Sequence, residues 1–310
     1  MHVANWSLRL AQGRSQRRSG PSRNRGSNAP DIAAFRERLG QLGYVEGRNL
    51  RIEARSANRQ SDQLAAVAAE LVRLNVDVIV TITTPAAQAA KAATMTIPIV
   101  MAGSAAPVAL GLVASLARPG GNVTGVTNSS GPGFAAKQLQ LLKEAAPKIS
   151  RVAIVMSSYP VESTAFKEME ASGPLLGVTP ISVIVDSPTQ INVATLLTQA
   201  RADALYVFPN SLNGTHSRVI ANFAAANHLP TMYGERDEVA AGGLMSYWVN
   251  WLELRRHAAD FVDKILKGAK PADLPVEDPT TFELVINLTT AKALGLALPQ
   301  SLLLRAEVIP

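Results

Sequence analysis

The amino-acid sequence predicts an α/β protein with two doubly wound lobes, each built on a parallel sheet and joined to the other by a hinge. Strand-like apolar runs alternate with helical stripes along the chain, which is the pattern of right-handed βαβ units. Hydrophobic residues make up 47% of the 310 residues but aromatic residues only 5%, so the core is largely aliphatic, as in sheets covered by helices on both faces. About ten strands are too many for one compact domain of this length, which favours two lobes.

The first part of the chain supplies helices and strands in alternation. Residues 31–42 carry a helical apolar stripe that begins at Asp31, placed as N-cap, and stops at Gly43. The run VDVIVTIT at 76–83 is mainly apolar, as expected for a strand buried on both faces. The same reasoning predicts further helices at 62–75, 84–93 and 107–116, and further strands at 49–57, 97–102 and 123–127.

The alternation then repeats to the end of the chain. Predicted strands are 152–156, 181–185, 204–208, 231–233, 243–248 and 282–287. Predicted helices are 134–146, 161–176, 193–199, 215–227, 251–267 and 289–294. These elements divide into an N-terminal lobe of 31–127 with 244–281 and a C-terminal lobe of 128–243 with 282–310.

The first thirty residues form a separate tail that holds the whole charge bias. Lys and Arg number 30 and Asp and Glu 24, and residues 1–30 contain six arginines but no lysine or acid, which leaves 24 charges of each sign in 31–310. The body therefore has no basic excess for nucleic acid. The Arg/Ser-rich tail is predicted to be disordered, and three interpretations stay open: an arm for an anionic surface, a natural solvated tail, or an artefactual N-terminus.

The order of elements also predicts a gap. A doubly wound lobe opens with a central strand, but the helix at 31–42 follows only the tail. We therefore expect the first strand of the N-terminal lobe to be missing, together with an export signal, since no basic segment is followed by an apolar stretch of about 7–15 residues. Unpaired backbone groups would then remain in the sheet.

Catalytic motifs are absent from the sequence. There is no cysteine, no G-x-x-x-x-G-K-[ST] loop, no G-x-G-x-x-G, no H-E-x-x-H and no G-x-S-x-G, and the four histidines stand apart from one another. No nucleophile is paired with a base, as acyl or glycosyl transfer requires. We predict neither an enzyme nor a metal site or cofactor.

Candidate ligand-binding residues follow the predicted strands, because ligands of open α/β sheets bind at the carboxyl ends of the strands. Small polar residues and helix starts suit a carboxylate, and an acid suits an ammonium group. Each segment is equally consistent with an ordinary capping turn, helix start or exposed loop. The candidates are Thr84, Pro85, Ala86, Gly103, Ser104, Ser158, Tyr159, Asn210, Asp237, Ser246 and Tyr247.

Long stretches of the sequence carry a family resemblance. They include FRERLGQLGYVEGRNLRIEAR at 35–55, GLVASLARPGGNVTGVT at 111–127, GGLMSY at 242–247, and the runs within 76–100 and 262–296. From about Ala34 to Ile309 the chain resembles the ABC-transporter substrate-binding proteins, a family that includes tryptophan/tyrosine-binding-like members. The resemblance implies a type I periplasmic-binding-protein fold, closing on its ligand by hinge motion. It also implies that Thr84–Ala86, Gly103–Ser104, Asp237 and Ser246–Tyr247 line the interlobe cleft.

The resemblance and the absent catalytic groups together favour a monomeric solute-binding component of an ABC importer. We expect it to capture a small molecule in the interlobe cleft, either an amino acid (aromatic ones included) or a related carboxylate, and to deliver it to a permease in the inner membrane. Its relatives imply a periplasmic or lipid-anchored location. The alternative is an intracellular ligand-sensing regulator on the same fold, although residues 1–30 show no helix pair for DNA.

Overall fold

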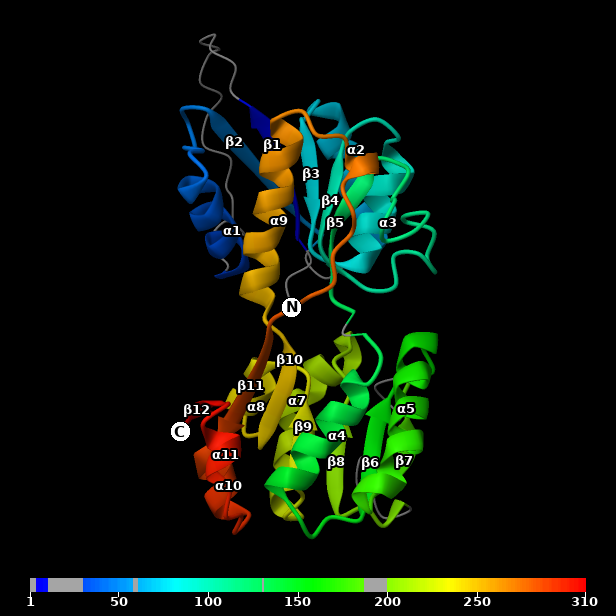
Figure 1. Ribbon diagram of the computed structural model, residues 1–310, viewed down its shortest axis with the longest axis vertical. Helices are drawn as coiled ribbons and strands as arrows, with labels where there is room; N and C mark the ends of the chain where they lie inside the picture. Colours follow the sequence, from blue (N-terminus) through cyan, green and yellow to red (C-terminus); the bar gives the residue numbers. More distant parts are fainter. Residues whose placement is uncertain (1–3, 11–29, 58–60, 130, 187–199) are drawn as a thin grey trace. The chain divides into compact units, whose positions relative to one another are not determined.

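The computed structural model describes residues 4–10, 30–57, 61–129, 131–186 and 200–310 (Figure 1). The predicted helix at 193–199 lies outside the described residues. The chain divides by its contacts into an N-terminal unit, formed by the described part of His2–Ser130 with Val249–Thr281, and a C-terminal unit, Gly131–Trp248 with Phe282–Pro310. Each unit is a mixed α/β fold around one sheet.

The N-terminal unit contains a five-stranded sheet in the order β2-β1-β3-β4-β5. Strands β3, β4 and β5 run parallel and are buried along their whole lengths, in agreement with their uncharged, mainly apolar sequences. The bounds of the strands are Ala4–Leu10 for β1, Leu50–Ser56 for β2, Val78–Thr81 for β3, Ile99–Ser104 for β4 and Val123–Thr127 for β5.

Helices flank this sheet. Helix α1 (Pro30–Gln41) packs against α9 (Trp251–Leu266), and the two lie side by side in Figure 1. Helix α2 (Leu64–Arg73), preceded by a short 3-10 turn at Ser61–Gln63, packs against α3 (Thr84–Ala93). A second 3-10 turn, Pro271–Asp273, follows α9.

The centre of this sheet differs from the prediction of a missing strand. Ala4–Leu10, from the segment expected to be disordered, lies between β2 and β3 and pairs antiparallel with both. Ser7, for example, is opposite Glu53 on one side and Ile79 on the other. The position is filled because two strands flanking a gap would otherwise leave rows of backbone donors and acceptors unpaired.

The C-terminal unit contains a seven-stranded sheet in the order β12-β11-β10-β9-β8-β6-β7. Strands β10, β9, β8, β6 and β7 form a parallel set. The bounds are Arg151–Met156 for β6, Thr179–Ile184 for β7, Ala204–Val207 for β8, Thr231–Tyr233 for β9, Met245–Val249 for β10, Phe282–Asn287 for β11 and Glu307–Ile309 for β12.

Both faces of this sheet are buried. Side chains of a strand alternate between the faces, so Val152, Ile154 and Met156 of β6 join one core cluster while Ala153 and Val155 join another. The helices are α4 (Phe134–Ala145), α5 (Pro160–Ser172) with its 3-10 extension Gly173–Leu176, α7 (Ser211–Ala226), α8 (Arg236–Ala240), α10 (Leu288–Ala293) and α11 (Gln300–Leu303).

One further expectation about the elements was wrong, and the contact-based division of the chain differs by a few residues from the expected lobe boundaries. Residues 107–116 form turns and not a helix, and Gly111, at φ 66°, holds a left-handed conformation that a helix does not admit. Strand β10 was assigned to the N-terminal lobe, but it pairs with β9 and its residues up to Trp248 belong to the C-terminal unit. The contacts accordingly divide after Ser130 and Trp248, later than the expected 127 and 243.

Candidate functional site

Two predicted residues of the N-terminal unit come together where β3 and β4 end. Thr84 opens α3, and its Oγ accepts a hydrogen bond of 2.8 Å from the backbone N–H of Ala105. Ser104 is the last residue of β4, and its side chain is fully buried. The Ser104 Oγ has no hydrogen-bond partner among the described residues. The Ser104 hydroxyl is therefore free to bond a further polar group at this strand end.

The N-terminus of α3 offers fewer donors than its sequence predicts. The Thr83 side chain accepts from the N–H of Ala86 at 3.4 Å, and Pro85 has no N–H. Ala86 is fully buried, whereas Pro85 is exposed. The Ala86 N–H, which the sequence analysis offered to a ligand, therefore already donates to the capping residue Thr83. The Thr84 hydroxyl is the polar side chain that remains at this helix start.

Gly103 is covered by α9. Its φ of 110° requires glycine, and a Cβ built there would lie 3.0 Å from the ring of Trp251. The Arg255 guanidinium stacks 5.3 Å from the centre of that ring and donates to the carbonyl of Ala102. Because glycine has no side chain, the first turns of α9 can pack directly against Gly103. Helix α9 thereby supports the turn that carries Ser104.

In the C-terminal unit, the loops after β6 and β8 meet at Glu162, a residue that the sequence analysis did not single out. Glu162 is 6% exposed. Its Oε2 accepts from the N–H of Ser157 at 2.7 Å and its Oε1 from the Ser157 hydroxyl at 2.9 Å. The side-chain amide of Asn210 donates to both carboxylate oxygens at 3.3 Å. Asn210, a predicted ligand residue, is therefore oriented by this carboxylate.

The other predicted residues of these loops face outward. Ser158 is exposed, and its N–H donates to Oδ1 of Asp186 at 2.8 Å. The Tyr159 side chain is 66% exposed, which is unusual for a large aromatic residue at a strand end. The structure therefore brings Ser157 and Asn210 together and leaves Ser158 and Tyr159 at the rim of the unit.

The acidic segment after β9 forms helix α8. Asp237 is exposed there, as an ammonium-binding acid would need to be. Its neighbour Glu238 is buried and closes a capping box with Glu235, accepting from the Glu235 N–H at 3.0 Å. Burial, reinforced by the nearby Glu235 and Asp237 charges, raises the pKa of Glu238 to about 8.

The two predicted residues of β10 have different surroundings. Ser246 is 2% exposed and lies opposite Tyr233 of β9. Tyr247 stacks on Phe134, with ring centroids 5.2 Å apart and an interplanar angle of 20°. Burial raises the pKa of the Tyr247 hydroxyl. Phe134 also contacts Phe282 at 5.0 Å, so Tyr247 belongs to an aromatic group at the edge of the C-terminal unit.

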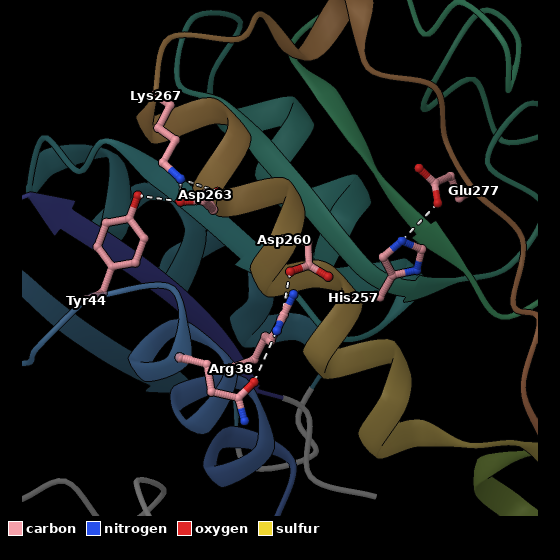
Figure 2. Close-up of polar contacts among 8 residues, drawn as sticks. Arg38, Tyr44, His257, Asp260, Asp263, Lys267 and Glu277 are labelled. Carbon is pink, nitrogen blue, oxygen red and sulfur yellow. Dashed lines mark hydrogen bonds and ion pairs between the residues drawn. The ribbon is translucent and has the colours of Figure 1, made fainter.

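A polar cavity of about 310 Å³ lies elsewhere, on the N-terminal unit beside α1 and α9, and none of the predicted ligand residues lines it. Figure 2 shows two of the ion pairs there: Arg38 with Asp260, whose atoms lie 2.8 Å apart, and His257, on the cavity wall, with Glu277, at 2.9 Å. Arg256 lies 3.5 Å from Glu37. These pairs join the two helices to each other and to the segment after α9.

Neither a metal cluster nor a membrane span is found in the part of the chain that the structure describes. No group of three His, Asp or Glu side chains there is arranged to hold a metal ion. No described helix is long and apolar enough to cross a membrane.

Comparison with known proteins accounts for the fold. The family model of ABC transporter substrate binding proteins matches residues 27–309. The chain belongs to the ABC transporter substrate-binding protein family. It is 28% identical over 265 residues to a tyrosine-binding protein of Clostridioides difficile, covering 84% of this chain and 75% of that protein.

Solved structures with the same fold agree. A protein from Streptococcus pneumoniae in complex with L-Trp superposes with a TM-score of 0.75 and 29% identity, covering 90% of this chain and 95% of the other. A conserved domain protein from Vibrio cholerae gives a TM-score of 0.77 and 28% identity with the same coverage. Family membership and these structures therefore confirm the α/β fold and the solute-binding function predicted for this protein. They do not favour the alternative of an intracellular ligand-sensing regulator.

Two residues that organise the site were missed in the sequence. Arg255 lies among Leu254, Ala258 and Ala259 on the buried stripe of α9, and an arginine in such a stripe is a signal that a polar partner faces it. Glu162 is the third residue after the N-cap of α5, a position where an acid ordinarily serves the helix start. Only the assembled sheet, in which β6 pairs with β8, shows that the Glu162 carboxylate also accepts a hydrogen bond from the Asn210 amide.

Proposed function

We propose that this substrate-binding protein captures an amino acid with an aromatic side chain, or a closely related carboxylate, and delivers it to an ABC permease. The observation that carries the proposal is the buried Ser104 Oγ without a described partner, next to the Thr84 hydroxyl at the start of α3. Two hydroxyls at converging strand ends suit the oxygens of a carboxylate, which accept hydrogen bonds only.

The ligand class is supported by relatives and by the aromatic group of the C-terminal unit. A relative is named a tyrosine-binding protein and another was solved with L-Trp. Tyr247, Phe134 and Phe282 form a ring surface that is half-buried and suited to an aromatic side chain. Asp237, exposed after β9, adds an acid for an ammonium group.

Family membership supports the remaining parts of the proposal, and the monomeric state is proposed with them. The protein acts by binding and not by catalysis, needs no cofactor, and works as a monomer in the periplasm or on a lipid anchor. Closure about a hinge retains the ligand until a permease of the inner membrane releases it.

Thermal unfolding of the full chain with L-tryptophan and L-tyrosine tests this proposal. A ligand at a hundredfold excess over its dissociation constant stabilises a binding-competent protein by about 2.7 kcal/mol. Ser104→Ala is expected to weaken binding about tenfold, because one donor to the carboxylate is lost. Thr96→Ala, which removes an exposed hydroxyl before β4, is the matched control. Unfolding curves that do not move with either amino acid would contradict the proposal.

A further inference from the structure

Arg255 places a positive charge in the interior of the N-terminal unit. It lies on the buried stripe of α9, with 2% of its surface exposed. Its guanidinium stacks 5.3 Å from the centre of the Trp251 ring and donates to the carbonyl of Ala102 in β4. Solvent and salt screen a buried charge much less than an exposed one. The end of β4 therefore lies in the field of a cation.

The same guanidinium lies against an irregular point of β4. The regular register between β4 and β5 shifts between Ala102 and Ser104, so Gly103 is an extra residue in the strand. A bulge of this kind changes the direction of the side chain that follows it. Arg255 bonds the carbonyl just before the bulge, and its Nη1 lies 3.4 Å from the position of a Gly103 Cβ. Arg255 thus supports the bulge that sets the direction of the Ser104 side chain.

The Ser104 hydroxyl, buried and without a partner among the described residues, does not by itself select the group that it binds. A hydroxyl both donates and accepts, so it suits either the carboxylate or the ammonium group of an amino acid. The neighbouring guanidinium resolves this choice, because a positive charge attracts a carboxylate and repels an ammonium group. Thr84 Oγ already accepts from the Ala105 N–H, so it offers its own proton, which again suits an acceptor.

We propose that Arg255 is a positioning residue that determines specificity: it holds the Gly103 bulge that presents Ser104, and its charge makes this strand end select a ligand carboxylate over an uncharged group. The inference rests on the proposed capture of an amino acid and adds which charge the N-terminal unit recognises. Arg255 acts through the Ala102–Ser104 turn and through its charge.

The test compares two ligands that differ only in the carboxylate. Calorimetric titration of the full chain is performed with L-tryptophan and with L-tryptophanamide, at about pH 6, so that the amino group of both is protonated. The wild type is expected to bind L-tryptophan at least about tenfold more tightly than the amide, since a charge-assisted contact is lost with the carboxylate.

Three variants separate charge from packing. Arg255→Gln keeps a donor and removes the charge, and should weaken L-tryptophan about tenfold, equivalent to about 1.4 kcal/mol, while changing the amide less than about twofold. Arg255→Lys restores the charge and should stay within about threefold of the wild type for both ligands. Arg256→Gln is the matched control, because this half-buried neighbour pairs with Glu37 and Glu253, and both affinities should be unchanged.

The outcomes are distinct. Equal losses for both ligands in Arg255→Gln, or a Lys variant as weak as the Gln variant, would show a role in packing alone and overturn the inference while the proposed function stands. Unchanged affinities in Arg255→Gln would overturn it as well.

The comparison does not depend on the folding of one variant. Melting curves show whether each variant folds, and equal affinities of the wild type for the acid and its amide would overturn the inference even if Arg255→Gln did not fold. A wild-type chain that binds neither ligand nor L-tyrosine would overturn the proposed function itself, and the inference with it.

Discussion

At the scale of single residues, the burial of Glu238 makes the free energy of unfolding depend on pH. Its folded-state pKa is raised to about 8, chiefly by burial. Between the unfolded-state pKa and this value the folded protein holds a proton that the unfolded chain has released. The free energy of unfolding therefore falls as pH rises through this window, by at most about 1.4 kcal/mol per pH unit.

Glu238→Gln is expected to remove this dependence. Glutamine keeps an oxygen for the Glu235 N–H and carries no titrating proton. Denaturant unfolding at pH 5, 7 and 9 should therefore show a flatter profile than the wild type, with the variant the more stable of the two at pH 9. Glu170→Gln, at an exposed site, should keep the wild-type slope. Parallel profiles for wild type and Glu238→Gln would contradict the assignment of the slope to this residue.

At the scale of elements, β1 is the strand that completes the sheet of the N-terminal unit. It pairs with a strand on each side, so its backbone groups serve two ladders. Ser7→Pro removes an N–H from the middle of this strand and is expected to destabilise the unit by about 1–3 kcal/mol. Ser7→Ala keeps the N–H and is the control. Urea unfolding followed by circular dichroism gives the difference, and equal midpoints for the two variants would show that β1 contributes nothing to stability.

The elements also show what the sequence can and cannot predict. The fully buried strands β5 and β9 have the predicted bounds, because β-branched and aromatic residues alternate there with few charged side chains and turn residues flank them. β1 was not predicted, since its place depends on a gap between β2 and β3 that only the assembled sheet shows. α8 has only five residues and was not predicted, because so short a helix has no periodicity to detect.

The candidate site, too, could be predicted from the sequence only in part. The rule that ligands bind at the ends of parallel strands predicted where the polar residues lie. The structure does bring Thr84 into contact with the Ser104–Ala105 turn. Which of these groups are already bonded depends on side-chain geometry: Thr83 takes the Ala86 N–H and Glu162 takes the Asn210 amide. These contacts join residues distant in the chain or compete for one donor, so no spacing rule reveals them.

At the scale of the whole molecule, the charge is divided between tail and body. The six arginines of residues 1–30 account for the formal net charge of +6, and the rest of the chain is balanced. A balanced body suits the capture of a small ligand whose own charges are matched locally, and gives no long-range attraction to polyanions.

Binding to a polyanion should therefore depend on the tail alone. The combined variant R14Q, R17Q, R18Q, R23Q and R25Q removes five positive charges and leaves β1, including Arg9, unchanged. The wild type is expected to elute from immobilised heparin at higher salt than this variant, because each released counterion adds to the salt dependence. Five substitutions of Lys or Arg to Gln on exposed sites of the body should lower retention much less. If the body variant lost as much retention as the tail variant, a basic surface would exist in the folded units, and the nucleic-acid alternative would regain support.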